Sequence, residues 1–222
     1  MDKKILNNYN KLKKNIKEVC KKINRNPNDI NLVSVSKASS ISEIEILINN
    51  EHRCFGENRL NNAMEKWKEL KKDNVSLHFI GALQSKKVKK IINFFDVIET
   101  LDTESSASEI AKCFQEKDEL KYKKKIYVQV NIGQEIQKRG VLPTDLTSFL
   151  MMCKKKYGLD IYGAMCMAPL NQNPGFYFKK MKEICDINNI RKISMGMSND
   201  YNQAIINGST NIRVGSLIFG KT

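Results

Sequence analysis

One lysine of this sequence stands at the end of an apolar run rather than on a polar helical face. Lys37 directly follows residues 32–36, Leu-Val-Ser-Val-Ser, a pattern that is typical of a β-strand. A lysine that is partly removed from water becomes a usable amine nucleophile, able to condense with an aldehyde. A lysine at the rim of a sheet, with its amine extended into solvent, would show the same spacing.

Two loops near the end of the chain combine glycine with hydroxyl side chains. The first spans residues 194–200, Ser-Met-Gly-Met-Ser-Asn-Asp, and leads into a predicted helix that Ser198 would cap. The second places Gly215 and Ser216 directly after the last predicted strand. Backbone N–H groups in such loops attract anions, and glycine lets a ligand approach the backbone closely. A helix cap and a glycine in a turn would be enough to explain the residues of either loop alone. Two such loops on neighbouring strands favour a phosphate site instead.

The elements that must position these residues are short strands that alternate with helical patterns. The strand-like runs lie at residues 32–36, 53–56, 77–80, 95–100, 126–132, 159–165, 192–195 and 212–214. Alternation of this kind indicates βαβ units and a parallel sheet. Eight units in 222 residues predict an α/β fold, a single (β/α)8 barrel of the TIM type. The competing fold is a doubly wound open sheet, but no Gly-x-Gly-x-x-Gly motif follows the first strand.

An additional helix is predicted before the first strand. Its apolar positions, from Ile5 to Ile23, recur at helical spacing. The chain ends soon after the eighth strand, so we expect this helix to occupy the outer position that a last helix would fill. A second helix is predicted over residues 60–72. In a closed barrel the first and last strands are neighbours, and the functional site lies at the carboxyl ends of the strands.

That geometry would bring Lys37 beside the two glycine loops. A phosphorylated aldehyde is the ligand that uses an amine and a phosphate site together, and pyridoxal 5′-phosphate (PLP) is the common one. An aldolase or lyase acting on sugar phosphates would use the same two parts.

The positive charge of the chain raises the question of whether it binds nucleic acid. Lys and Arg number 38 and Asp and Glu 24, a formal net charge of +14, but only six of the basic residues are Arg. Nucleic-acid recognition favours Arg and interleaved aromatic residues, so we expect a solvated lysine-rich surface instead. No apolar run is long enough for a membrane span. Six cysteines without a Cys-x-x-Cys pair, and only two histidines, predict reduced thiols in a cytoplasmic protein and no metal site. The sequence does not fix the oligomeric state, and we take a monomer as the default expectation.

Longer strings of residues carry a family resemblance. The sequence resembles the pyridoxal-phosphate homeostasis proteins, single-domain PLP-binding barrels similar to the N-terminal domain of alanine racemase. The matching segments are residues 33–37, 55–58, 77–87, 130–132, 138–140, 167–169, 194–200 and 208–215. The strings His-Phe-Ile-Gly-x-Leu-Gln and Ser-Met-Gly-Met-Ser-x-Asp are the most specific of them.

The resemblance implies a role for each matching residue. Lys37 would hold PLP as a Schiff base, and Arg213 would approach the pyridine nitrogen. Asn58 would line the ring pocket, with Met167 and His78 near the site. The phosphate would be held, mainly through backbone N–H groups, by Gly196, Met197, Ser198, Gly215 and Ser216.

The resemblance also implies that residues 1–222 form one PLP-binding domain, which sequesters PLP and supplies it to PLP-dependent apoenzymes without a dedicated turnover. The alternative is a PLP-dependent enzyme similar to an amino-acid racemase, although racemases of this type take a tyrosine base from a second domain. Two further expectations come from the residues themselves. His78 could be a structural histidine at the end of its strand, and His52 is expected at the surface.

Overall fold

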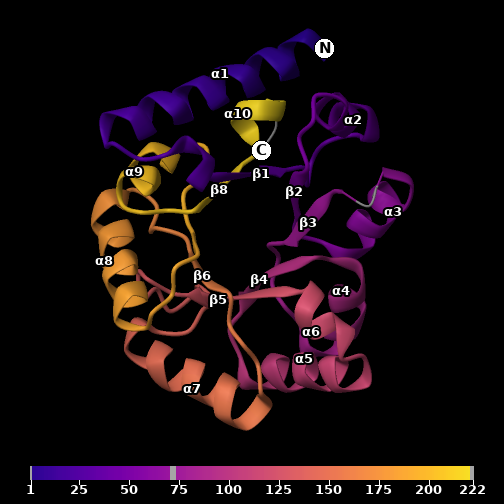
Figure 1. Ribbon diagram of the computed structural model, residues 1–222, viewed down its shortest axis with the longest axis vertical. Coiled ribbons are helices and arrows are strands. Elements are labelled where there is room, and N and C mark those ends of the chain that lie inside the picture. Colours follow the sequence, from indigo (N-terminus) through magenta and orange to yellow (C-terminus); the bar gives the residue numbers. More distant parts are fainter. Residues whose placement is uncertain (1, 71–73, 221–222) are drawn as a thin grey trace.

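Eight parallel strands close into a barrel in the order in which they occur along the chain (Figure 1). The computed structural model describes residues 2–70 and 74–220. The last strand pairs with the first, in a register that places Asn31 opposite Asn211 and Ser34 opposite Val214. The strands are β1 (Asn31–Val35), β2 (Cys54–Glu57), β3 (Ser76–Phe79), β4 (Val97–Leu101), β5 (Lys125–Val130), β6 (Gly163–Cys166), β7 (Ile193–Ser194) and β8 (Asn211–Val214). This confirms the predicted TIM-type barrel.

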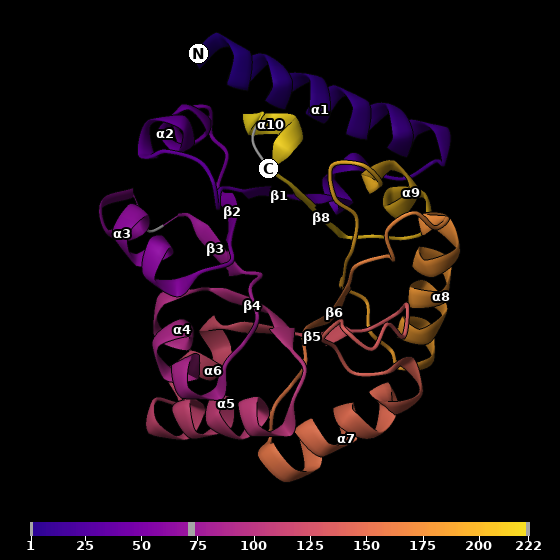
Figure 2. The ribbon, with the colours of Figure 1, turned by 180° about the vertical axis from the view of Figure 1, so that it is seen from behind.

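Helices surround the ring of strands on its outer side (Figure 2). They are α1 (Asp2–Lys22), α2 (Ile41–Asn49), α3 (Leu60–Leu70), α4 (Val88–Phe94), α5 (Glu104–Glu116), α6 (Glu119–Lys123), α7 (Leu146–Tyr157), α8 (Pro174–Ile187), α9 (Tyr201–Ile206) and α10 (Ser216–Phe219). Three short 3₁₀ segments add η1 (Pro27–Asp29), η2 (Ser85–Lys87) and η3 (Pro143–Asp145). The predicted end of the helix over residues 60–72 lies partly outside the described residues.

Helix α1 fills the outer position between the ends of the chain, as the sequence predicts. Figures 1 and 2 both show it crossing the outside of β1 and β8, with the short α10 between them. Its apolar face, which includes Ile5, Leu12 and Ile16, is buried, while its lysines lie on the other side. A 21-residue amphipathic helix thereby covers the strands that α10, at four residues, is too short to cover.

The main apolar core lies between the strands and the helices, where Trp67, Phe55 and Phe178 are fully buried. The inside of the barrel differs, because several of the side chains that meet there are polar. Glu99 of β4 accepts a hydrogen bond from the Ser194 hydroxyl of β7 at 2.6 Å. These strands are not neighbours in the ring, so this contact crosses the interior.

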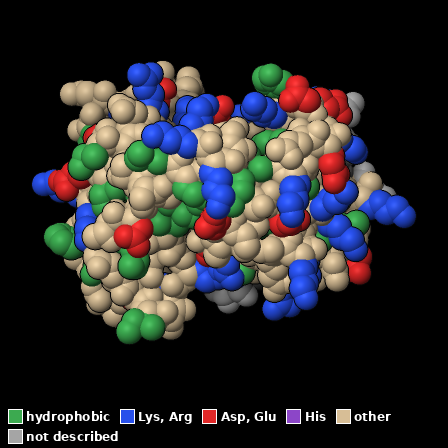
Figure 3. All heavy atoms as spheres, turned by 90° about the horizontal axis from the view of Figure 1, so that it is seen from below, with side chains coloured by type: hydrophobic (Ala, Val, Ile, Leu, Met, Phe, Trp, Pro, Cys, Tyr) green, Lys and Arg blue, Asp and Glu red, His purple; other side chains and the backbone are tan. Residues whose placement is uncertain are grey.

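Strand β6 begins at Gly163, later than the predicted start at residue 159. Figure 3 shows Lys and Arg side chains on one face spread among Asp and Glu rather than gathered in one patch. No helix in the described part of the chain is long and apolar enough to cross a membrane.

Candidate functional site

A cavity of about 540 Å³ opens at the carboxyl ends of the strands. Most of the residues predicted for a PLP site line it, namely Lys37, Asn58, Met167, Met197, Ser198, Arg213, Gly215 and Ser216. They come from the ends of β1, β2, β6, β7 and β8. Parallel strands place their carboxyl ends at one mouth of a barrel, so residues far apart in the sequence meet there.

Lys37 sits in a short loop between β1 and α2. The loop ends where Ser40 and Glu43 cap α2 reciprocally, each side chain bonding the backbone N–H of the other. Lys37 itself is exposed, so the partial removal from water that its strand position suggested is not seen. Among the described residues, none forms a hydrogen bond or ion pair with its amine. The amine is therefore available to a ligand in the cavity.

The residue before Lys37 is held by a buried polar network. The Ser36 N–H donates to the Gly56 carbonyl at 3.0 Å, and its hydroxyl donates to Glu57 Oε1 at 2.7 Å. Lys66 Nζ donates to the Ser36 carbonyl at 2.6 Å and pairs with the same Glu57 oxygen at 2.7 Å. Glu57 is buried, and these contacts fix the ends of β1 and β2 relative to each other.

The loop after β7 turns at Gly196, whose φ of +95° lies in a region that favours glycine. A Cβ there would lie 2.5 Å from the Cβ of Ala204 in α9. The Met197 N–H donates to Asp200 Oδ1 at 2.6 Å, so this donor already has a partner. Burial raises the pKa of Asp200, while this hydrogen bond and the charge of Arg213 oppose the rise.

The prediction that Ser198 caps the following helix is wrong. Helix α9 begins at Tyr201, and Asp200 occupies the N-cap position, because the chain makes an additional turn before the helix starts. Ser198 instead lines the cavity from within that turn. The described residues supply no acceptor for its backbone N–H, which is thus free to bind an anion.

The loop after β8 supplies a second set of donors. Ser216 begins α10 after Gly215, and no described residue accepts a hydrogen bond from the backbone N–H of either. A Cβ at Gly215 would lie 3.0 Å from the carbonyl oxygen of Val35. This close approach places the free N–H groups next to the end of β1, two residues before Lys37.

Arg213 is buried between the cavity and the interior of the barrel. Its Nη1 donates to the Ser194 hydroxyl at 2.7 Å and its Nη2 to the Cys166 carbonyl at 2.9 Å. Glu99 Oε2 lies 3.7 Å from Nη1. These contacts use part of the five-donor guanidinium and fix its plane, which leaves the remaining N–H groups to a ligand in the cavity.

Asn58 owes its position to a glycine that sequence reasoning did not single out as a site residue. A Cβ at Gly81 would lie 1.9 Å from the Asn58 carbonyl oxygen, so no larger residue fits. The Gly81 carbonyl is in turn held by the Thr100 hydroxyl at 2.6 Å. Glu57 and Asp200 were also missed. Both lie within segments that match the family, Asp200 in residues 194–200 and Glu57 in residues 55–58. The family resemblance could therefore have pointed to them.

His78 does not join the other predicted residues. It is buried in β3, where Nδ1 lies 2.6 Å from Glu99 Oε1 and Nε2 lies 3.2 Å from Cys54 Sγ. It lines a different cavity, formed at the amino ends of the strands. The prediction that placed it near the PLP site is corrected, because its side chain points into the barrel towards Cys54 and the cavity at the opposite mouth. His52, expected at the surface, is buried.

Comparison with known proteins places this barrel in a defined class. The family model of the alanine racemase N-terminal domain matches residues 8–222. The pyridoxal phosphate homeostasis protein of Haemophilus influenzae is 31% identical over 97% of this chain and 95% of its own length. That of Schizosaccharomyces pombe is 36% identical over 88% of this chain and 85% of its own. The chain belongs to the pyridoxal phosphate homeostasis protein family.

Solved structures agree with this assignment. PipY of Synechococcus elongatus, determined with PLP bound, matches with a TM-score of 0.76 at 28% identity, covering 92% of this chain and all of PipY. An alanine racemase of Clostridium difficile also matches with a TM-score of 0.76, at 14% identity, covering 99% of this chain but 57% of the racemase. At that identity the likeness to the racemase shows the fold alone.

Proposed function

We propose that this chain binds PLP in the cavity at the carboxyl ends of its strands, sequesters it, and supplies it to PLP-dependent apoenzymes. The observation that carries the proposal is the meeting of an unpaired amine, a fixed guanidinium and free backbone N–H groups around one cavity. This donor set matches the aldehyde, the ring nitrogen and the phosphate of PLP. When PLP is bound, its aldehyde carbon condenses reversibly with a primary amine to form a Schiff base.

Each end of the cofactor would have its own partner. Lys37 supplies the amine, and the N–H groups of Ser198, Gly215 and Ser216 bind the phosphate. Arg213 donates a hydrogen bond to the pyridine nitrogen. An arginine only donates, so the ring nitrogen stays unprotonated and the ring withdraws electrons less strongly.

The lining of the cavity supports binding without turnover. Its described residues include three titratable side chains, those of Lys37, Asp200 and Arg213. Asp200 bonds the Met197 N–H, and Arg213 does not release its proton. While Lys37 is joined to PLP, the Asp200 carboxylate is the one other group of the described lining that could take up a proton, and one of its oxygens already accepts from the Met197 N–H.

The second candidate is an amino-acid racemase, which the shared fold with alanine racemase favours. Two measurements on the PLP-loaded protein separate the candidates. The carrier is expected to restore activity to an apo form of a PLP-dependent enzyme and to leave D- and L-alanine unchanged. Steady interconversion of the alanine enantiomers would favour the racemase, and failure to bind PLP at all would overturn both. The one-domain, monomeric and cytoplasmic assignments stay predictions.

A further inference from the structure

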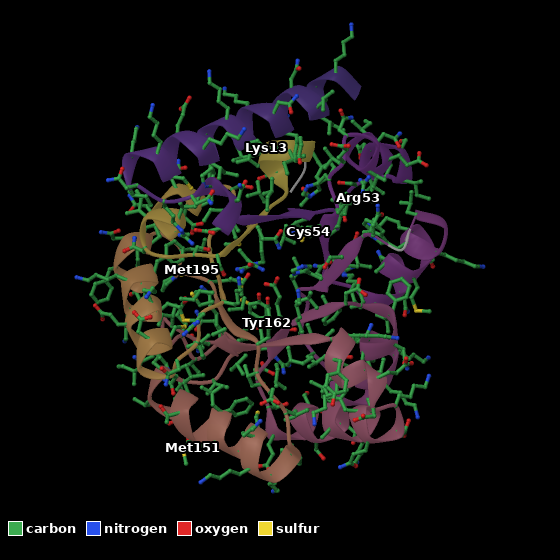
Figure 4. The ribbon with its side chains drawn as sticks, in the orientation of Figure 1. Lys13, Arg53, Cys54, Met151, Tyr162 and Met195 are labelled. Carbon is green, nitrogen blue, oxygen red and sulfur yellow. The ribbon has the colours of Figure 1, made fainter. Side chains whose placement is uncertain are left out.

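A second cavity, of about 750 Å³, opens at the opposite mouth of the barrel. The first residues of several strands line it, among them Asn31, Cys54, Ser76, Val97, Lys125 and Asn211. Figure 4 shows Cys54 and Tyr162 beside the central opening of the ring, with Arg53 further out. This cavity takes no part in the proposed binding of PLP, and the inference drawn from it is independent of that function.

Cys54 is the nucleophilic side chain of this cavity. Its Sγ lies 3.2 Å from His78 Nε2 and accepts a hydrogen bond from Asn31 Nδ2 at 3.3 Å. The other nitrogen of the same ring, His78 Nδ1, lies 2.6 Å from Glu99 Oε1. A cysteine bonded to a histidine, which a carboxylate orients in turn, is the arrangement that activates a thiol for attack.

The partners of His78 and Glu99 shift the pKa of both groups. Burial alone would lower the pKa of His78, but Cys54 on one side and Glu99 on the other raise it to about 10. The hydrogen bond from His78 and the charge of Arg213 hold the pKa of Glu99 below its usual value against the effect of burial. Both partners thus favour the protonated form of His78. A neighbouring imidazolium stabilises a thiolate, the nucleophilic form of cysteine.

The other five cysteines lack these features. Burial raises the pKa of each, to about 12 for three of them; they are Cys20, Cys113, Cys153, Cys166 and Cys185. Cys54 has 8% of its surface exposed and lines an open cavity. A search of the described residues finds no group of His, Cys, Asp and Glu side chains placed to bind a metal ion, the row of Cys54, His78 and Glu99 included.

The cavity selects its reagent by charge. Its described lining contains four cationic side chains, Arg25, Arg53, Lys125 and Lys192, and one acidic side chain, Asp29. Lys125 Nζ lies 5.0 Å from the centre of the Tyr162 ring, which forms part of the wall. A wall with this excess of positive charge raises the local concentration of small anions.

We propose that Cys54 is a thiol-modification site that reacts with small disulfides carrying carboxylate groups. The Cys54 thiolate attacks one sulfur of the disulfide, and a new S–S bond forms as the original S–S bond breaks. The departing half leaves as a thiolate with the bonding electron pair, and the proton given up by Cys54 resides on His78 Nε2. The disulfide is the only oxidant that this step needs.

The test uses the native, full-length protein and two aromatic disulfides that release a coloured thiolate. Dithiobis-nitrobenzoate carries carboxylates, whereas dithiodipyridine is neutral. We expect one equivalent of coloured thiolate per chain to be released rapidly, at least about tenfold faster than the thiolate released by the other cysteines. Peptide mass analysis should then place the adduct on Cys54. Cys54→Ser should remove this rapid phase, while Cys113→Ser, the matched control, should leave it unchanged.

Two further variants test the mechanism. Lys125→Gln should slow the reaction with dithiobis-nitrobenzoate several-fold and leave that with dithiodipyridine unchanged, because only the anion is attracted. His78→Gln should slow both reagents about tenfold, provided that its circular dichroism matches that of the wild type. A rapid equivalent that persists in Cys54→Ser, or no reaction before the protein is denatured, would overturn the proposal. If Lys125→Gln slowed both reagents equally, the cavity would not select its reagent by charge.

Discussion

Gly215 lies directly against Val35, so that the end of β8 packs closely on the end of β1. A Cβ at Gly215 would come within 3.0 Å of the Val35 carbonyl oxygen and 3.3 Å of the Val35 Cβ. This approach joins the two halves of the candidate site, because Lys37 follows Val35 by two residues. The amine and the free N–H groups of the last loop are neighbours as a consequence of barrel closure.

Gly215→Ala should force the loop away from β1 and weaken PLP binding about tenfold, equivalent to about 1.4 kcal/mol. The measurement is a titration with PLP that follows visible absorbance. Gly175→Ala is the control, since the atoms nearest to a Cβ there belong to the side chains of Gln203 and Asn173 rather than to the backbone. Unchanged affinity in Gly215→Ala would show that the loop does not bind the phosphate.

The Ser198 hydroxyl should contribute little to binding. The backbone N–H groups supply most of the phosphate donors, so Ser198→Ala should weaken PLP retention only about threefold, as for one neutral hydrogen bond. Dialysis of the loaded protein, with the remaining PLP measured over time, tests this. A complete loss of PLP would mean that the hydroxyl is the main phosphate donor.

Arg213 should control the spectrum of bound PLP. Arg213→Lys cannot preserve both the contact with Ser194 and that with the Cys166 carbonyl, and we expect a loss of about 2 kcal/mol in the free energy of unfolding. The absorbance maximum of bound PLP should shift, because the donor facing the ring nitrogen is displaced. Arg139→Lys, at a partly exposed residue paired with Asp102, serves as control. Identical spectra for wild type and Arg213→Lys would exclude Arg213 from this role.

His52 should make stability depend on pH in the acidic range. Its Nε2 donates to the Cys54 carbonyl at 2.6 Å, and its Nδ1 accepts from the Tyr9 hydroxyl at 3.2 Å. Burial lowers the pKa of His52 to about 4. The unfolded chain therefore binds the additional proton first, and stability is lost as the pH falls from about 6.5 towards 4.

The full effect of that shift is about 3 kcal/mol in the free energy of unfolding. Urea unfolding of wild type and His52→Gln across this pH range measures it. The wild type should lose more stability than the variant as the pH falls, since other groups titrate equally in both proteins. Parallel curves for the two proteins would show that His52 does not titrate in this way.

The fold could be predicted because its signals are local. Eight apolar runs alternate with helical patterns, and the amphipathic residues of α1 mark the helix that covers β1 and β8. The same regularity predicted which loops meet, so Lys37, Arg213 and Gly215 were brought together correctly. The start of β6 and the cap of α9 were missed, because apolar residues before Gly163 and a hydroxyl at Ser198 mimic the expected signals.

The interior of the barrel could not be predicted in the same way. Alternation along a strand indicates which side chains point inward but not which of them meet, and Glu99 and Ser194 are 95 positions apart. The contacts among Glu99, His78 and Cys54 depend on strand register, which a single sequence does not reveal. For the same reason His78 was assigned to the wrong mouth of the barrel. Lys37 was expected to be partly buried, whereas its loop leaves it exposed.

The most direct test of the account is reduction of the PLP-loaded protein with borohydride, followed by peptide mass analysis. The account predicts one pyridoxyl group per chain, attached to Lys37, and loss of both the label and the visible absorbance in Lys37→Ala but not in Lys138→Ala. Attachment of the label to another lysine, or an unchanged spectrum in Lys37→Ala, would contradict it.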